Sequence, residues 1–448
     1  MSFSSITLPI FLGVCCTIFH HVGEKVTRPF IDEIFHLRQC QVYCKHDFSS
    51  WDDKITTPPG LYILGTAYSH VLHGLGVDNS CGQDALRSLN LVAGAVVLPL
   101  VLSMASTANF WRVNVMSLPL LFSYYFLFYT DVWSTVLVVA CVLCVAKSRS
   151  MSGSVTANVV GFLSLWFRQT NIVWVAFAGL VLVDFRRRRT PTFWGNARAF
   201  VSQALHDWLL LVPFCINGAL FAAFLKINGG ITFGDKENHH VTVHLVQIFY
   251  CFTFMAVLTF PVWVSRSALA QYVRFAVTGN KWVNIAPTVA SFVAINWVIE
   301  NFTVVHPFLL ADNRHYTFYI YRKILSRPLA NLALVPVYHF CTWAVFHSLV
   351  RTSKKAFLSI SPVLTLGFFA AIAATLIPSP LFEPRYYIVP LVLFRVFITP
   401  ESSTTMTQNQ RHLFEFLWYT SINVVFFIVF FGYEFTWVSE PGTQRIIW

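Results

Sequence analysis

The sequence predicts an all-α protein that crosses a membrane many times. Its 448 residues are 56% hydrophobic and only 11% charged, whereas soluble domains carry about 25% charged residues. Aromatic residues reach 17%, with 44 Phe and 14 Trp. A water-soluble chain of this size could not cover its surface with so few charges. The same composition excludes a disordered chain and a small disulfide-stapled secreted domain.

The excess of basic residues does not require nucleic acid as a partner, and we expect none. The formal net charge is +11. Cytoplasmic loops of membrane proteins retain Lys and Arg, and the run Arg186–Arg189 fits such a loop.

Apolar segments along the chain are the expected spans, although several are shorter than the roughly 20 residues of a straight crossing. The first follows an uncharged amino terminus and is expected to be a retained signal anchor. The thirteen segments lie near residues 6–22, 88–107, 113–129, 131–146, 154–167, 171–184, 207–225, 244–263, 283–303, 329–350, 356–377, 386–399 and 413–432.

A long polar segment, residues 23–86, follows the first span. Within it, Gly60–Leu75 is amphipathic and is expected to be a surface helix, because it is short and carries His70 and His73 near its end. Pro58 and Pro59 favour a helix start directly after them. Whether any pair among the loop cysteines Cys40, Cys44 and Cys81 forms a disulfide is left open.

Charge predicts the orientation of the spans. If the amino terminus is cytoplasmic, the loops on its side carry Lys and Arg at about twice the density of the opposite face. The opposite face then concentrates carboxylates, His and Trp. A Gly60–Leu75 helix that crossed the membrane would invert every later segment, so this orientation depends on its lying at the surface.

Five polar clusters share the opposite face in this topology. Ionisable groups at a membrane border are unfavourable and usually serve a function. The clusters are RPFIDEIFHLRQCQVYC at 28–44, WDDKITTPPGLY at 51–62, FRQTN at 167–171, GDKENHHVTVH at 234–244, and HPFLLADNRHY at 306–316 with EPRYY at 383–387.

The first cluster places two carboxylates beside an imidazole. If residues 31–41 are helical, His36 lies one turn from both Asp32 and Glu33. Neighbouring carboxylates raise one another's pKa, and His can hold or relay a proton. Acids in the first turn of a helix are also common without any catalytic role.

The other clusters suggest sugar and phosphate binding. Trp51 beside Asp52 suits a sugar ring, although Trp is also common at membrane borders. Cations such as Arg314 and Arg385 suit a phosphate, but local ion pairs contribute little by themselves. Arg168 needs a partner if it is buried, or it extends to the interface. His239, His240 and His244 are a weak zinc pattern.

These motifs together resemble the dolichyl-phosphate-glucose alpha-1,2-glucosyltransferases of the endoplasmic reticulum. The segments that carry the resemblance are FIDEIFHLRQCQVYC, WDDKITTPPGLY, FRQTN, GDKENHH, LLADNRHYTFYIYRK and EPRYYIVP, and it extends over most of the chain. It implies a GT-C type bundle of about 12–14 transmembrane helices, formed as one domain over residues 1–448, with residues 23–86 as a large first lumenal loop.

The resemblance implies an inverting transferase of the endoplasmic reticulum membrane, with a lumenal active site. The donor is dolichyl phosphate glucose, the acceptor is a diglucosylated dolichyl-diphosphate oligosaccharide, and both reside among membrane lipids. Asp32 is the expected general base, with Glu33 as second choice. We expect no cofactor and no metal. Expected contacts to the donor phosphate are Arg385, Arg314, His315 and Arg168, and expected acceptor or sugar contacts are His36, Trp51, Asp52, Asp235, His239 and Asp312.

Two alternatives fit the composition less well. One is another lumenal GT-C transferase that uses a dolichyl-phosphate sugar. The other is a multi-span transporter, which would place ionisable groups near the bilayer midplane, often in two related halves. The polar clusters here lie in loops and at span ends, and no internal repeat is visible.

Overall fold

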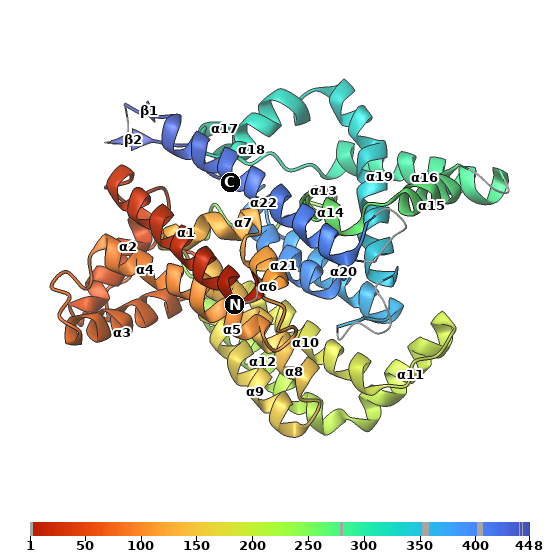
Figure 1. Cartoon of the computed structure of the whole chain (residues 1–448), viewed down its shortest axis with the longest axis horizontal. Coiled ribbons are helices and arrows are strands. Elements are labelled where there is room, and N and C mark those ends of the chain that lie inside the picture. The colour runs from red at the N-terminus through yellow and green to blue at the C-terminus, as the bar shows by residue number, and fades with distance from the viewer. Residues whose placement is uncertain (1–2, 278–280, 352–357, 401–405, 439, 441) are drawn as a thin grey trace. The chain divides into compact units, whose positions relative to one another are not determined.

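The computed structural model describes residues 3–277, 281–351, 358–400, 406–438, 440 and 442–448. The chain forms two compact units, Met1–His239 with Thr436–Gln444, and His240–Phe435 with Arg445–Trp448. The described residues are overwhelmingly helical, which confirms the all-α class (Figure 1). That residues 1–448 act as a single domain stays a prediction.

The first unit contains twelve α-helices and three irregular helical segments. α4, η1 and α5 join into one continuous helix, in which η1 is a π-helical turn. The elements are α1 Phe3–Lys25, α2 Glu33–Cys44, α3 Gly60–Gly74, α4 Gln83–Val92, η1 Ala93–Val97, α5 Leu98–Leu102, α6 Asn109–Met116, α7 Pro119–Phe122, η2 Ser123–Phe126, α8 Asp131–Lys147, α9 Met151–Leu165, η3 Gln169–Asn171, α10 Ile172–Arg186, α11 Phe193–His206 and α12 Trp208–Asn228.

The second unit contains the remaining helices. Two short strands, β1 Phe435–Thr436 and β2 Thr443–Gln444, pair near the carboxyl end of the chain. The helices are α13 Gln247–Leu258, α14 Phe260–Trp263, α15 Arg266–Ala276, α16 Lys281–Phe302, α17 Pro307–Ala311, α18 Tyr316–Ile320, η4 Tyr321–Leu325, α19 Pro328–Arg351, α20 Pro362–Leu376, η5 Pro384–Tyr387, α21 Ile388–Phe397 and α22 Gln408–Gly432.

Six helices in the described part of the chain are long and apolar enough to cross a membrane, so the protein is a multi-pass membrane protein. Shorter apolar helices, such as α9, α13 and α20, accompany them. The total of 12–14 crossings stays a prediction. The six are Ile6–Lys25, Gln83–Leu102, Trp208–Asn228, Ile285–Phe302, Pro328–Arg351 and Gln408–Gly432.

Two expected spans are not continuous helices. The segment 113–129 is divided into α6, α7 and η2, because Pro119 cannot donate the backbone hydrogen bond that a continuing helix needs. The segment 244–263 breaks at Thr259, directly before the turn that carries Pro261. The start of the expected span 356–377 falls outside the described residues, and α20 begins at Pro362.

The first loop is a folded layer, and its predicted helices are confirmed. α2 covers residues 33–41 of the helix expected at 31–41, and α3 begins at Gly60 directly after Pro59. The two helices pack through Leu37, Cys40 and Tyr62 onto Leu86 of α4. Gly65 permits this approach, since a Cβ there would lie 2.6 Å from the Cys40 sulfur. The layer holds the acidic motif at the start of α2.

Candidate active site

Asp32 lies at the amino terminus of α2, where its side chain is neither fully buried nor fully exposed. The preceding residue, Ile31, has a φ of +52°. A β-branched residue in this left-handed region is strained, and such strain tends to occur at functional sites. The kink turns the chain into α2, whose first turn closes with the His36 amide donating to the Asp32 carbonyl at 3.1 Å.

Glu33, the adjacent acid, is completely buried and bound on all sides. Arg87 of α4 donates two hydrogen bonds to its carboxylate, from Nε to Oε1 at 2.8 Å and from Nη2 to Oε2 at 2.6 Å. The amides of Phe30 and Phe128 donate to the same oxygens at 3.0 and 2.8 Å. These four bonds occupy the acceptor sites of a carboxylate. The environment of Glu33 therefore suits a structural role, whereas Asp32 remains accessible.

His36 lies one turn further along α2 and is held by aromatic residues. Its Nδ1 is 2.7 Å from the Tyr62 hydroxyl of α3, and the Tyr129 ring packs edge-on at 5.7 Å. Burial raises the pKa of Tyr62 well above its usual range, so the phenol keeps its proton. This hydrogen bond fixes the orientation of the His36 ring against α3.

Trp51 and Asp52 are fixed beside these residues. The Gln39 side chain bridges α2 to this loop, donating to the Ser50 carbonyl at 2.8 Å and accepting from the Asp52 amide at 2.9 Å. The Trp51 ring lies 5.8 Å from the Tyr62 ring and 5.9 Å from the Phe233 ring. Its buried indole nitrogen has no hydrogen-bond partner among the described residues.

Three of the predicted clusters adjoin one another at the backbone of residues 53–56. The Thr56 carbonyl accepts from the Gln169 side chain at 3.0 Å and from the Phe233 amide at 3.1 Å. Next to it, the Asp235 amide donates to the Asp53 carbonyl at 2.8 Å. Gly234 is required here, because a Cβ would lie 2.2 Å from that carbonyl oxygen. The 51–62, 167–171 and 234–239 segments thus form one surface within the first unit.

Asp235 and His239 contact each other at the edge of this surface. Asp235 has a φ of +46°, and its carboxylate accepts from Asn238 at 2.7 Å and lies 3.2 Å from His239 Nδ1. Within the described residues, the one group of three potential metal ligands in mutual reach is Cys40, Cys44 and Cys81. Among the residues that the structure describes, His239, His240 and His244 do not form such a group.

Arg168 pairs with an acid that the sequence did not single out. Its Nη2 donates to Asp131 Oδ1 at 2.8 Å. Asp131 begins α8 and is 3% exposed, and its second oxygen has no hydrogen-bond partner among the described residues. Asp131 follows Tyr129, which packs against His36, so the pair belongs to the same neighbourhood as the acidic motif.

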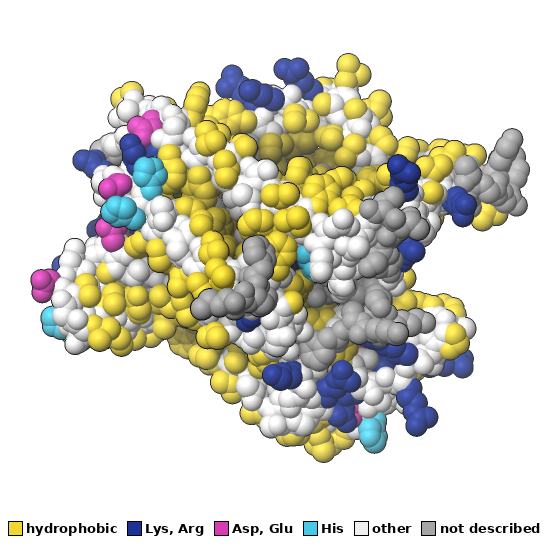
Figure 2. Space-filling model, in the orientation of Figure 1, with side chains coloured by type: hydrophobic (Ala, Val, Ile, Leu, Met, Phe, Trp, Pro, Cys, Tyr) yellow, Lys and Arg dark blue, Asp and Glu magenta, His cyan; other side chains and the backbone are white. Residues whose placement is uncertain are grey.

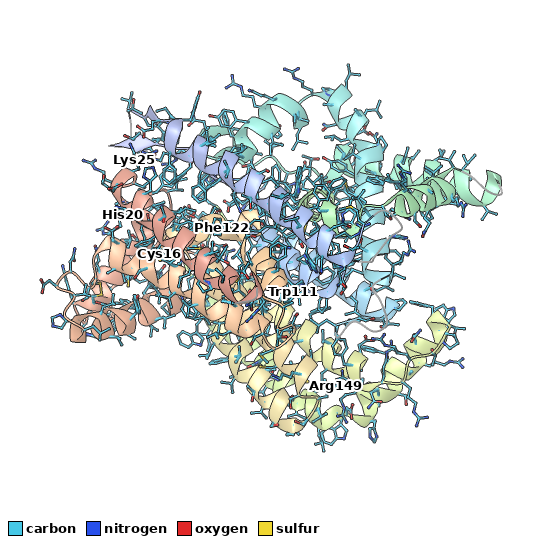
Figure 3. The ribbon with its side chains drawn as sticks, viewed as in Figure 1. Cys16, His20, Lys25, Trp111, Phe122 and Arg149 are labelled. Atoms are coloured by element: carbon cyan, nitrogen blue, oxygen red, sulfur yellow. A yellow bond between two sulfur atoms is a disulfide. The ribbon has the colours of Figure 1, made fainter. Side chains whose placement is uncertain are left out.

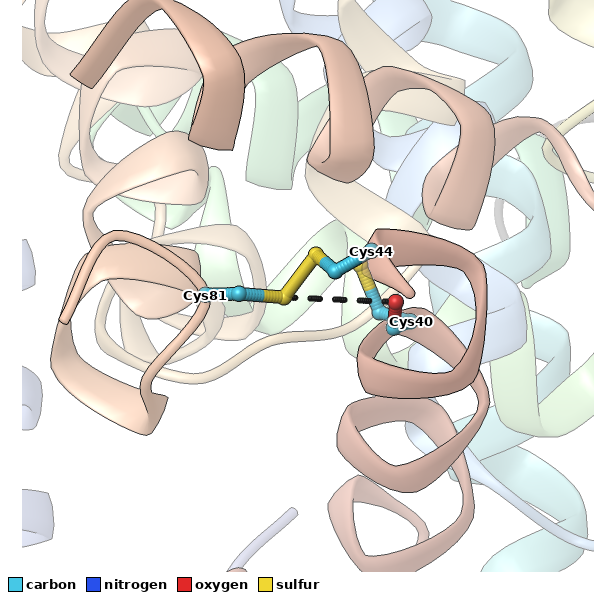
Figure 4. A group of neighbouring side chains, drawn as sticks. All are labelled: Cys40, Cys44 and Cys81. Atoms are coloured by element: carbon cyan, nitrogen blue, oxygen red, sulfur yellow. Dashed lines mark hydrogen bonds between the residues drawn. A yellow bond between two sulfur atoms is a disulfide. The ribbon is translucent and has the colours of Figure 1, made fainter. Parts of the chain in front are cut away.

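A disulfide joins Cys44 at the end of α2 to Cys81 before α4, closing a separation of 37 residues (Figure 4). Cys40, one turn earlier, remains a free thiol and contacts the Tyr62 carbonyl at 3.7 Å. Burial raises the pKa of Cys40 to about 12, which keeps it protonated and unreactive. The pairing that the sequence left open is therefore Cys44 with Cys81.

In the second unit, Arg314 and His315 are held by local partners. Arg314 is 7% exposed and binds Asp312 through Nε at 3.0 Å and Nη2 at 2.7 Å. His315 Nδ1 lies 3.1 Å from the Trp448 backbone oxygen. The carboxyl-terminal segment contacts the backbone beside Arg314: the Ile447 amide donates to the Arg314 carbonyl at 2.7 Å.

Arg385 forms a similar local pair. Its Nε contacts Glu383, two residues earlier, and its guanidinium lies 5.8 Å from the centre of the Tyr386 ring. The side chains of Arg385 and Glu383 are 16% and 19% exposed. The neighbouring Tyr387 is fully buried and donates to Gln247 at 2.5 Å, which anchors this segment to α13.

Several residues that hold the site together were not predicted from the sequence. Arg87 is a charge directly before the expected span 88–107, and Asp131 is the first residue of the expected span 131–146. A charge at such a position is only weak evidence for a role in the site. Tyr62 was inside a quoted motif but had no assigned role. Arg395, which lies within the expected span 386–399, is fully buried and paired with Glu415 of α22.

Comparison with known proteins identifies the family of this chain. The model of the DIE2/ALG10 family matches residues 26–396. The chain belongs to the DIE2/ALG10 family. A Debaryomyces hansenii relative is 47% identical over 98% of each chain, and a Candida albicans relative is 40% identical over 96% of each. A human relative is 30% identical over 97% of this chain and 96% of its own.

All three relatives are named Dol-P-Glc:Glc(2)Man(9)GlcNAc(2)-PP-Dol alpha-1,2-glucosyltransferase. No solved structure matches the chain. Membership of the DIE2/ALG10 family confirms the resemblance drawn from the motifs. The individual roles of the site residues remain predictions.

Proposed function

We propose that this protein transfers glucose from dolichyl phosphate glucose to the diglucosylated lipid-linked oligosaccharide, forming an alpha-1,2 bond. The observation that carries this proposal is the match over nearly the full chain to relatives with that named activity. The acidic motif supports it, because the first loop is folded so as to hold one carboxylate rigidly and leave its neighbour accessible.

The proposed chemistry is a single displacement with inversion. The 2-hydroxyl oxygen of the acceptor glucose attacks C1 of the donor, the bond from C1 to the phosphate oxygen breaks, and the beta-linked donor gives an alpha-linked product. One general base must take the hydroxyl proton, as in inverting glycosidases. We assign this role to Asp32, since the Glu33 carboxylate is buried and fully hydrogen-bonded.

Sugar binding is proposed for the surface around α2 and the 51–62 loop. His36 and Asp52 offer hydrogen-bonding groups, and Trp51 offers an aromatic face next to Tyr62. Asp235 and His239 adjoin this surface through the contact of residues 233–235 with residues 53–56. Asp312, which belongs to the second unit, is proposed separately as an acceptor contact.

The leaving group is a phosphate whose charge grows as the bond breaks, so it needs preorganised cations. Arg168, Arg314, His315 and Arg385 are each proposed for this role. Asp131 would position Arg168 through the 2.8 Å ion pair. A phosphate leaves readily when cations stabilise it, and we therefore propose that the reaction needs no metal or other cofactor.

We place the protein in the endoplasmic reticulum membrane with the first loop in the lumen. The Cys44–Cys81 disulfide supports this orientation, because disulfides persist in oxidising compartments and are rare in the cytosol. The disulfide is independent of the charge argument, and both favour the same side for Asp32.

The deciding experiment uses the purified protein, dolichyl phosphate glucose and diglucosylated lipid-linked oligosaccharide. The expected product gains one hexose, and a linkage-specific glucosidase should release it as an alpha-1,2 glucose. Addition of a different hexose from its own dolichyl phosphate donor would favour another lumenal transferase. Uptake of a substrate into sealed vesicles without any added hexose would favour a transporter.

A further inference from the structure

The helix α11 is an apolar-faced element that does not cross the membrane. It has 14 residues, a length of about 21 Å, which is too short for a bilayer crossing. Among its residues only Asn196 is buried. The helix ends at His206, and the membrane-spanning α12 begins at Trp208. The chain connection therefore holds α11 at the border between membrane and water.

One side of α11 exposes large apolar groups. Trp194, Val201 and Leu205 are 76%, 58% and 71% exposed. Their spacing of seven and four residues places them on the same helix face. Trp208, 60% exposed at the start of α12, extends the apolar surface to the membrane span. A helix of this kind at a membrane border lies in the interface with its apolar side in the lipid.

Cations lie beside this apolar face and, in the case of Arg198, on it. Arg188 and Arg198 are exposed on the connection before α11 and on the helix itself, and Lys147 is exposed at the end of α8. Arg149 in the α8–α9 turn is labelled in Figure 3. Its guanidinium donates to the Phe185 carbonyl at 2.8 Å, which connects this turn to the end of α10. Figure 2 shows Lys and Arg gathered over the region of α11.

Two acids lie near the basic turn before α11, but they do not neutralise the exposed cations. Asp184 is buried against Arg187, and Asp207 is buried against Arg186. Arg187 also donates to Asn196 at 2.7 Å, which fixes the basic turn to the first turn of α11. The remaining positive charge lies beside an exposed apolar surface, and phosphate-bearing headgroups are the complement of such a charge.

We propose that α11 and the basic turns beside it bind anionic phospholipids of the membrane surface. Trp194, Val201 and Leu205 would enter the boundary between headgroups and acyl chains. Arg188, Arg198 and Lys147 would contact the headgroup phosphates. In the predicted topology this is the cytoplasmic leaflet, which carries the anionic lipids. The surface is separate from the proposed glucosyl transfer and does not depend on it.

The test measures lipid retained by the purified full-length protein in mixed micelles of phosphatidylcholine and phosphatidylinositol, by native mass spectrometry. The wild type should retain phosphatidylinositol preferentially. The Arg188→Gln/Arg198→Gln variant should lose about fivefold of this preference for each charge removed. A matched control, Lys323→Gln/Arg327→Gln, removes two exposed charges from the second unit and should keep the preference.

A second measurement uses a photo-crosslinking residue at Leu205 in nanodiscs that contain both lipids. We expect lipid adducts at this position, and their number should increase with the phosphatidylinositol fraction. An unchanged preference in the Arg188→Gln/Arg198→Gln variant, an equal loss in the control, or protein adducts in place of lipid adducts would each overturn the proposal. None of these readouts requires transferase activity, so a failure here leaves the proposed function standing.

Discussion

The ion pair of the acidic motif differs from those of two predicted phosphate contacts, Arg314 and Arg385. Glu33 and Arg87 are 54 residues apart in sequence and almost completely excluded from solvent, at 0% and 1% exposure. Arg314 and Arg385 instead bind acids two residues earlier, Asp312 and Glu383, and all four side chains keep some exposed surface. The first pair joins distant segments, whereas the other two join neighbours in one short segment.

This difference indicates two kinds of function for a charge. Removing one partner from a buried long-range pair leaves an uncompensated charge inside the fold. A pair of near neighbours that keeps part of its surface exposed, such as Arg385 with Glu383, contributes less to stability, and we expect its arginine to exchange the carboxylate for a ligand phosphate. Arg395 and Glu415, both fully buried, show that the second unit also contains a pair of the first kind.

The largest effect should come from Asp32, which lies outside the buried pair. Asp32→Asn should lower glucosyl transfer by about 100- to 10,000-fold, the range for loss of a general base, with the melting temperature unchanged. The measurement is turnover with both lipid substrates at saturation. Asp53→Asn, an exposed acid in the same loop, should keep wild-type turnover. Near-normal turnover of Asp32→Asn would remove it as the base.

Breaking the buried pair should affect stability before chemistry. Arg87→Met leaves Glu33 buried without its partner and should cost about 3–5 kcal/mol of unfolding free energy. The double variant Glu33→Gln/Arg87→Met should be markedly more stable than Arg87→Met alone, because no charge is then left unpaired. Thermal unfolding in detergent measures both. Equal stability of the single and double variants would contradict a structural role for the Glu33–Arg87 pair.

The disulfide should stabilise the same layer to a somewhat smaller extent. Cys44→Ser/Cys81→Ser should lose about 2–4 kcal/mol, typical of a native disulfide. The wild type treated with reductant should approach the melting temperature of this variant. Cys215→Ser, which changes an exposed free cysteine, serves as the control and should behave as wild type. If reductant leaves the wild type unchanged, the disulfide does not stabilise the folded loop.

Features that depend on neighbours along the chain could be predicted from the sequence. Periodicity and the Pro58–Pro59 pair located α3 to within a residue, and the local pairs of Arg314 and Arg385 were visible because their acids are two residues away. Pro119 also lay in plain view, but hydrophobicity alone merged α6, α7 and η2 into one expected span.

Long-range pairs could not be derived in the same way. The choice between Asp32 and Glu33 depends on Arg87, which the fold brings from α4, and on the Phe128 amide, 95 residues from Glu33. The Arg168–Asp131 and Arg395–Glu415 pairs also join residues that are 37 and 20 positions apart in sequence. A single sequence contains no record of which distant charges meet, so these contacts required the structure.

Glu383 provides the sharpest test of the exchangeable pair. Arg385→Ala should weaken binding of dolichyl phosphate glucose and of dolichyl phosphate by about 10- to 100-fold, the range for losing charge-assisted hydrogen bonds. Arg385→Lys should restore only part of the lost lipid affinity, since a point charge replaces a planar fork.

Glu383→Gln removes the carboxylate that competes with the phosphate. This variant should therefore bind both lipids as tightly as the wild type or up to about threefold more tightly. If Glu383 instead positions Arg385, as Glu33 is held by Arg87, Glu383→Gln should weaken binding in the same direction as Arg385→Ala. Lipid affinities of the three variants, measured with Lys323→Gln as a control for general charge, separate an exchangeable pair from a fixed one.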